Sequence, residues 1–282
     1  MYEFFIEPLT YGFMARGLLV TLIAALVCAL LSCWLVLMGW SLMGDAISHA
    51  VLPGVALAYI LGLPFALGAL VAALLAVGLI GAVSRQGRVK EDAAIGIVFT
   101  VMFALGLVLI SVTPSQTDLH SIILGNVLGV SWADVAQIAA LAAVVVSLLL
   151  VKRRDLVLYA FDPGYTQAIG LRPALLSGLL LLALALTSVL ALQIVGVVLV
   201  VALLVIPGST ARLLTDRFTS MLVISSAVSV TGAVTGFYLS YALDISAGGA
   251  VVLVLGFLFA LAYLLAPGQG LISRKKKERT GA

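Results

Sequence analysis

Charged residues are scarce in this sequence. Only 10% of its 282 residues are Asp, Glu, Lys or Arg, whereas 63% are hydrophobic. The mean hydropathy of the chain is correspondingly high, at +1.28. A typical water-soluble domain carries about 25% charged residues, so this composition excludes a soluble globular protein.

Reactive and nucleotide-binding residues are also rare. The two cysteines, Cys28 and Cys33, lie in one apolar run at a spacing that fits neither a disulfide framework nor a CxxC metal site. We expect both to pack against lipid or a neighbouring helix. The chain has no GxxxxGK[ST] phosphate-binding loop, and therefore no ATPase site of that kind. No nucleophile with a base and an orienting partner is apparent, which argues against an enzyme.

The hydrophobic residues are gathered into long runs. A membrane-spanning helix needs roughly 20 of them, so we predict an all-α polytopic membrane protein with about nine transmembrane helices. No domain boundary is visible, and residues 1–282 are expected to form one transmembrane domain. The run over 174–207 is too long for one crossing, so we divide it near Gln193. The predicted spans are about 13–37, 41–62, 64–84, 93–112, 133–151, 174–193, 193–207, 219–242 and 248–266.

The basic residues predict the orientation of these spans. Lys and Arg accumulate on the cytoplasmic side of membrane proteins. With the basic tail 274–279 inside, the loops 85–90, 152–172 and 212–217 fall inside too, and Arg16 alone falls outside. We therefore predict a multi-pass protein of the cell membrane with its N-terminus outside and its C-terminus in the cytoplasm.

Polar residues interrupt the second predicted span. Asp45 and His49 are four residues apart, so they share one face of a helix. Pro53 follows four residues later and predicts a kink that frees the carbonyl of His49. Carboxylate, imidazole and carbonyl groups are ligands for a small divalent cation. The alternative is that Asp45 caps the second helix and that His49 is a packing residue with its hydrogen bonds satisfied.

A second polar segment follows the fifth span. Pro163 suits the first turn of a helix with Asp162 as its cap, and Gly170 suits a C-terminal stop. These signals predict a short cytoplasmic helix at about 161–172. It is either an ordinary loop helix or a surface that transmits force from a partner, since the chain holds no motor of its own.

The segment from Ser41 to Leu57 resembles the most distinctive motif of the metal-type ABC transporter permeases, the membrane subunits of manganese, zinc and iron importers. Weaker matches follow in chain order at 94–99, 124–128, 161–170 and 201–207. The residues at 43–49 are more similar to manganese-type than to zinc-type members. The sequence departs from the family at Gly208-Ser209, which follow Pro207 where relatives carry small alanines. Whether the turn at Pro207 lines the pore is therefore in doubt.

The resemblance implies a type II-like importer fold, in which two copies of this subunit surround a central path with a pair of Asp45 and His49. It also implies two kinds of partner: separate cytoplasmic ATP-binding subunits, and an extracytoplasmic protein that delivers the metal. The cytoplasmic segment would be the coupling helix, with the motif residues Phe161, Asp162, Pro163, Ala168 and Gly170.

We therefore predict the permease subunit of an ATP-driven importer whose substrate is Mn²⁺, with Zn²⁺ or Fe²⁺ as further candidates. Membrane lipid surrounds it, and neither a covalently bound cofactor nor a nucleic-acid partner is expected. Three alternatives stay open. An ABC permease for a metal chelate predicts a wide apolar cavity that is not ringed by ionisable side chains. An ion-coupled secondary metal transporter would use Asp45 as its proton site. A membrane scaffold without transport predicts that Asp45 is a helix cap, that His49 is a packing residue and that the protein does not depend on a metal.

Overall fold

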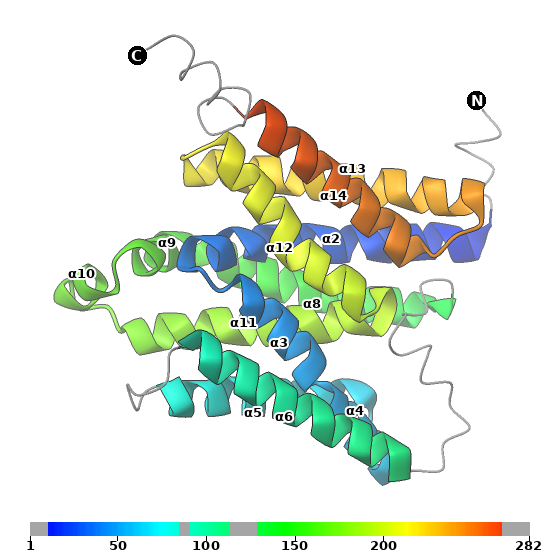
Figure 1. The fold of residues 1–282 in the computed structure, drawn as a ribbon, viewed down its shortest axis with the longest axis horizontal. Coiled ribbons are helices and arrows are strands. Elements are labelled where there is room, and N and C mark those ends of the chain that lie inside the picture. The colour runs from blue at the N-terminus through cyan, green and yellow to red at the C-terminus, as the bar shows by residue number, and fades with distance from the viewer. Residues whose placement is uncertain (1–10, 85–90, 113–128, 267–282) are drawn as a thin grey trace. The chain divides into compact units, whose positions relative to one another are not determined.

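A computed structural model describes residues 11–84, 91–112 and 129–266. Within these ranges the secondary structure is helical, without a strand, as the composition predicts. The basic loop 85–90, the apolar match at 124–128 and the basic tail 274–279 lie outside the described residues. The helices are α2 (Gly12–Met38), α3 (Ser41–Ala50), α4 (Leu52–Leu61), α5 (Phe65–Ser84), α6 (Glu91–Val112), α8 (Trp132–Val151), α9 (Arg153–Phe161), α10 (Pro163–Ala168), α11 (Pro173–Val195), α12 (Val197–Leu214), α13 (Phe218–Leu243) and α14 (Ala247–Leu265) (Figure 1).

Long apolar helices dominate the described part of the chain. Six of its segments are long and apolar enough to cross a membrane: α2, α6, α8, α13, α14 and Leu42–Leu61, which comprises most of α3 with α4. Shorter apolar segments lie in α5, α11 and α12. A polytopic helical membrane protein is thus confirmed. The count of nine crossings and the orientation stay predictions.

The boundary between α11 and α12 lies three residues after its predicted position. The sequence places it near Gln193, but α11 continues to Val195 and the break is at Gly196. Gly196 has a φ of 78°, a conformation that costs little only for glycine. The backbone freedom of glycine, rather than the polarity of Gln193, therefore decides where this long apolar run divides.

Pro207 also differs from its prediction, because it lies inside α12 and not in a turn. Gly208, the next residue, contacts α2. The backbone N–H of Gly208 donates a hydrogen bond to the Ser32 hydroxyl oxygen on α2, at 3.0 Å. Gly208 is therefore part of a close contact between α12 and α2, and a pore role for this region stays a prediction.

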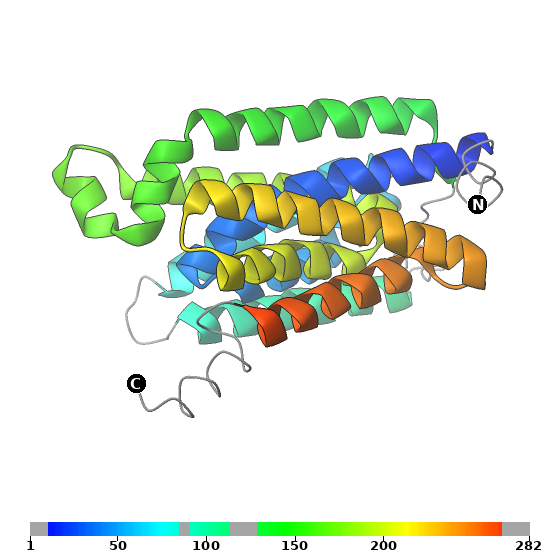
Figure 2. The same ribbon diagram turned by 90° about the horizontal axis from the view of Figure 1, so that it is seen from above.

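The chain divides into two compact units, each discontinuous in sequence. Among the described residues, the first comprises 11–39, 129–142 and 202–266. In it α13 packs against both α2 and α14 (Figure 2). The hydroxyls of Ser225 and Ser229 donate to the α2 carbonyls of Ala29 and Ala25, at 2.8 and 2.9 Å. Cys28 and Cys33 are fully buried in this unit, which confirms their packing role against other helices.

Among the described residues, the second unit comprises 40–84, 91–112 and 143–201 and contains both polar segments singled out in the sequence. In it α6 packs against α3, α4 and α5, and α11 packs against α3 and α5. The short helices α9 and α10 pack on each other and on the start of α11. A single domain over 1–282 stays a prediction, and the candidate sites below all lie in this second unit.

Candidate metal site

A break divides the helix that carries the polar pair. Helix α3 ends at Ala50, α4 begins at Leu52, and Pro53 lies in the first turn of α4. Proline has no N–H and fits the first turn of a helix, so it starts α4 rather than extending α3. The Val51 carbonyl accepts the N–H groups of Gly54 and Val55, at 3.0 and 3.1 Å. The chain therefore changes helix two residues before the proline.

Asp45 and His49 lie side by side on α3. The Nε2 atom of His49 is 3.3 Å from an Asp45 carboxylate oxygen. Both side chains are partly exposed, at 27% for His49 and 38% for Asp45. The N-cap of α3 is Trp40, so Asp45 lies more than one turn inside the helix and does not cap it. The alternative in which Asp45 is a helix cap is therefore wrong.

His49 also differs from a packing residue with its hydrogen bonds satisfied. Its Nδ1 atom is buried and has no hydrogen-bond partner in the described part of the chain. The imidazole instead meets two aromatic rings of α6. The ring centroids of Phe99 and Phe103 are each 5.3 Å from that of His49, tilted by 56° and 86° respectively. Polar contact on one nitrogen and aromatic contact around the ring together set its position.

Helix α6 packs against the helices on both sides of the break, α3 and α4. Phe99 and Phe103 contact α3, whereas a Cβ atom at Gly106 would lie 3.0 Å from the backbone nitrogen of Pro53 in α4. The sequence analysis missed these α6 residues as parts of the site. Two phenylalanines spaced by four in an apolar span were the available signal, and that pattern is common to ordinary packing faces.

Helix α4 is held equally closely on its other side by α5. Gly54 and Gly68 face each other so closely that a Cβ atom at Gly54 would lie 2.0 Å from the Gly68 carbonyl oxygen. A Cβ atom at Gly68 would lie 2.1 Å from the Gly54 carbonyl oxygen. No side chain larger than hydrogen fits at either position. The segment after the break is thus fixed between α5 and α6.

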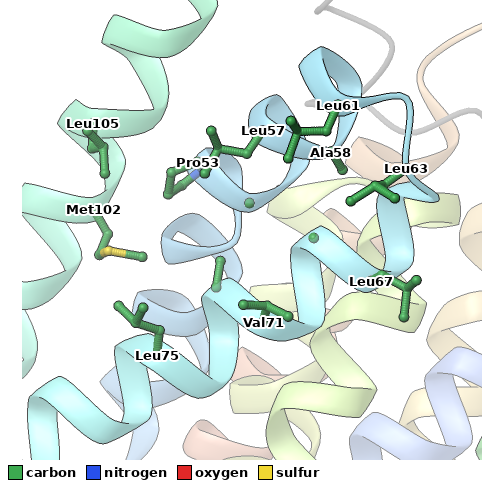
Figure 3. A pocket seen from close by; sticks show the side chains of 13 residues that line it. Pro53, Leu57, Ala58, Leu61, Leu63, Leu67, Val71, Leu75, Met102 and Leu105 are labelled. Atoms are coloured by element: carbon green, nitrogen blue, oxygen red, sulfur yellow. The ribbon is translucent and has the colours of Figure 1, made fainter.

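A cavity of about 320 Å³ lies among α4, α5 and α6. In Figure 3, Pro53 and Leu57 of α4 face Met102 and Leu105 of α6, and Val71 and Leu75 of α5 line the floor. The lining contains neither Asp45 nor His49. This cavity therefore offers no ionisable ligand to a metal, and the polar pair on α3 is a separate feature of the unit.

The second polar segment folds as two short helices. Asp162 caps α10 as predicted, because its carboxylate oxygen accepts the Tyr165 N–H at 2.9 Å. The segment ends at Gly170, whose φ is 87°. The predicted helix at 161–172 is too long, since α10 is Pro163–Ala168 and Phe161 ends α9. The large hydrophobic residues Phe161, Tyr165 and Ile169 of this segment are all at least half exposed.

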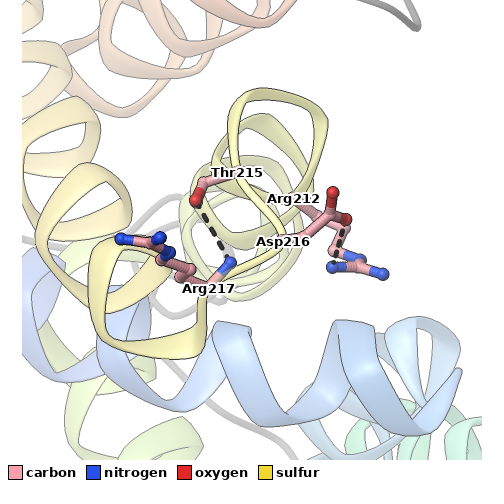
Figure 4. Close-up of polar contacts among 4 residues, drawn as sticks. All are labelled: Arg212, Thr215, Asp216 and Arg217. Atoms are coloured by element: carbon pink, nitrogen blue, oxygen red, sulfur yellow. Dashed lines mark hydrogen bonds and ion pairs between the residues drawn. The ribbon is translucent and has the colours of Figure 1, made fainter.

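The end of α12 and its connection to α13 carry the basic residues of another predicted cytoplasmic loop. Arg212 forms an ion pair with Asp216, with 3.0 Å between nitrogen and oxygen (Figure 4). The side chain of Arg217 points away from this pair, while its backbone N–H donates to the Thr215 hydroxyl. Exposed pairs of this kind contribute little stability.

Comparison with known proteins places this geometry in a family. The model of the ABC 3 transport family matches residues 10–266. The chain is 49% identical over 280 residues to the manganese transport system membrane protein MntB of Synechocystis sp., a match that covers 99% of this chain and 92% of the relative. It is 47% identical over 265 residues to a probable iron transport system membrane protein of Haemophilus influenzae, over 93% of this chain and 98% of that one.

A solved structure agrees with these relatives. PsaBC from Streptococcus pneumoniae in complex with Fab matches with a TM-score of 0.88 and 37% identity, over 98% of this chain and all of that chain. The match extends over nearly the whole chain and includes the segment that carries Asp45, His49 and Pro53. The chain therefore belongs to the ABC 3 transport family, the metal-type ABC permeases that its motifs resemble, and is a multi-pass membrane protein.

Proposed function

We propose that this chain is the permease subunit of an ATP-driven importer of a divalent transition metal, with Mn²⁺ as its main substrate. The observation that carries the proposal is the 3.3 Å separation between His49 Nε2 and an Asp45 oxygen. Two ligand atoms that each lie about 2.1 Å from one ion, at about 90° to 110°, are about 3.0 to 3.4 Å apart. The pair therefore suits two neighbouring positions on a single ion.

One chain offers too few ligands to enclose the ion. The described residues contain no group of three or more His, Cys, Asp or Glu side chains that could hold a metal. Partial exposure of Asp45 and His49 leaves them accessible to further ligands. A second copy of the chain would supply another carboxylate and imidazole, and water could fill the remaining positions. Such a site would form only in the homodimer.

Helix geometry relates the pair to the predicted cytoplasmic side. The connection before α3 consists of Gly39 and Trp40, and it lies inside in the predicted orientation. At about 1.5 Å per residue, Asp45 lies about 6 Å and His49 about 12 Å along the axis from Ser41. The hydrocarbon core is about 30 Å thick. We therefore place the site in the inner half of the path, where it would control release of the ion into the cytoplasm.

The choice of metal rests on ligand type and on the relatives. Mixed oxygen and nitrogen ligation suits Mn²⁺ and also accommodates Fe²⁺ or Zn²⁺. One relative is named for manganese and another for iron. The deciding experiment is uptake of radiolabelled Mn²⁺ into proteoliposomes that contain the permease, its ATPase and the delivering protein, with Zn²⁺ or Fe²⁺ as competitor. We expect Mn²⁺ to be transported with the highest kcat/KM.

The same experiment separates the main alternatives. ATP-independent uptake by the permease alone would favour a secondary transporter driven by an ion gradient. Transport of a chelate without transport of the free ion would favour a chelate permease, and no uptake of either would favour a scaffold. Transport of Zn²⁺ or Fe²⁺ in preference to Mn²⁺ would keep the metal importer and change its substrate.

The exposed side chains of Phe161, Tyr165 and Ile169 are the proposed contact with the ATPase. These residues are exposed by 61%, 55% and 50%, so they contribute little to the permease's own core. Thr166 of α10 is fully buried, and its hydroxyl donates to the Asp162 carbonyl one turn earlier. Movement of the ATPase would pass through α10 and α9 to α11, against which α9 and α10 pack.

Replacing Tyr165 by Ala tests this contact. We expect the affinity for the ATPase to fall by about 30-fold, because exposed aromatic residues at the centre of an interface often contribute 2 kcal/mol or more. ATP-driven uptake should fall in proportion, while the thermal stability of the permease stays near that of the wild type. Tyr241→Ala is the matched control, since Tyr241 is 40% exposed at the end of α13. Unchanged ATPase binding by Tyr165→Ala would place the contact elsewhere.

A further inference from the structure

His49 lacks the second partner that a metal-binding histidine usually has. Such a histidine normally donates its other ring N–H to a carboxylate, a carbonyl or water, which orients the ring and strengthens the ligand. In this structure the Nδ1 atom of His49 is buried without a hydrogen-bond partner among the described residues. The hydroxyl of the neighbouring Ser48 donates to the Gly44 carbonyl at 2.8 Å and forms no hydrogen bond with Nδ1. The ring must therefore be oriented by something else.

The aromatic rings of α6 are placed to do this. Phe99 and Phe103 are one turn apart, and their own centroids are 6.1 Å apart. The His49 ring contacts both at 5.3 Å, nearly perpendicular to Phe103 and inclined to Phe99. Aromatic pairs favour such edge-to-face geometries at centroid distances of about 4.5 to 7 Å. Two rings at different inclinations restrict both rotation and tilt of the imidazole.

We propose that Phe99 and Phe103 are positioning residues that hold Nε2 of His49 toward Asp45, while the unpartnered Nδ1 atom keeps the site's affinity low. The inference rests on the proposed role of His49 as a metal ligand. When Nε2 binds the ion, the ring proton must be on Nδ1, where these residues offer it no acceptor. Loss of such a partner typically costs about 10- to 100-fold in metal affinity. A transport site benefits, because an ion held too tightly is not released.

The test uses the complete permease–ATPase complex in nanodiscs, with Co²⁺ as a spectroscopic probe and Mn²⁺ uptake as a second readout. We expect Phe103→Leu to weaken Co²⁺ binding by about tenfold, at the low end of the range for supporting residues, and to shift its visible absorption bands. KM for Mn²⁺ should rise with little change in kcat. Phe103→Tyr retains the ring and should retain both the spectrum and KM. Phe99→Leu provides the same test should Phe103→Leu fail to assemble.

Two controls separate the possible failures. Phe259→Leu removes a ring of α14 that stacks on Tyr263 in the other unit, so it should leave the Co²⁺ spectrum unchanged. His49→Ala should abolish the signal. If His49→Ala binds Co²⁺ like the wild type, the proposed metal site itself is wrong. If His49→Ala loses the signal but Phe99→Leu and Phe103→Leu keep the wild-type spectrum and affinity, the positioning role alone is overturned.

Discussion

Replacement of Asp45 or His49 by Ala is expected to reduce ATP-driven Mn²⁺ uptake by at least about 100-fold. Removing a ligand should cost more than the 10- to 100-fold typical of a lost supporting partner. The two side chains lie 3.3 Å apart and are partly exposed, so each should be removable without disturbing the helix core. Initial uptake rates in proteoliposomes, normalised to permease that has assembled with its ATPase, measure the effect.

The matched control for Asp45→Ala is Asp216→Ala, which removes a carboxylate from an exposed ion pair with Arg212. Its uptake should stay within about twofold of the wild type, since surface pairs contribute little. ATP hydrolysis by the assembled complex separates two causes of lost uptake. Normal hydrolysis would indicate that the ion site is lost, and reduced hydrolysis would indicate that the ATPase is impaired. Wild-type uptake by correctly assembled Asp45→Ala and His49→Ala variants would remove both residues from the ion path.

The second large effect concerns the contact between α4 and α5. Gly68→Ala would place a methyl group 2.1 Å from the Gly54 carbonyl oxygen, so the two helices must move apart. Overpacking of this kind costs about 1 to 3 kcal/mol and occasionally more. We expect a fall in Tm of about 3 to 10 °C and a loss of uptake, because α4 begins directly after the site. Thermal unfolding of the purified permease measures the first effect.

Gly78→Ala is the control, because Gly78 lies in the same helix with nothing within 4 Å of an added Cβ atom. This substitution should be neutral or raise stability, since Ala is the better helix former. Opposite signs at two glycines of one helix would identify close helix approach as the cause. Equal stability of both variants would contradict the tight contact.

The sequence predicts the long helices of this protein well, because its apolar runs are long. The bounds of α2, α6 and α13 lie within about two residues of the predicted spans, an error that is common for helix ends. The division at Gly196 was missed, because polarity at Gln193 and backbone freedom at Gly196 compete within four residues. Helix α9 was also missed, since its many polar and charged residues resemble those of a loop.

The site was predicted only in part. Asp45, His49 and Pro53 share one local segment, so helix periodicity alone places them together. The sequence says nothing direct about Phe99 and Phe103, which meet His49 only after α6 packs on α3. Nor does it predict the unpartnered Nδ1 atom, since a hydrogen-bond partner could come from any segment. Local residue patterns predict the candidate ligands, whereas tertiary packing determines which side chains surround them.

The two serine contacts between α13 and α2 have a mechanical consequence. Ser225 and Ser229 are one turn apart, and so are the carbonyls of Ala29 and Ala25 that accept their hydrogen bonds. Sliding one helix past the other by a fraction of a turn would break both bonds together. A shift by four residues, about 6 Å at 1.5 Å per residue, is the smallest that would bring a serine back to a carbonyl of this pair. The two helices therefore resist gradual sliding and would move together as one rigid pair during transport.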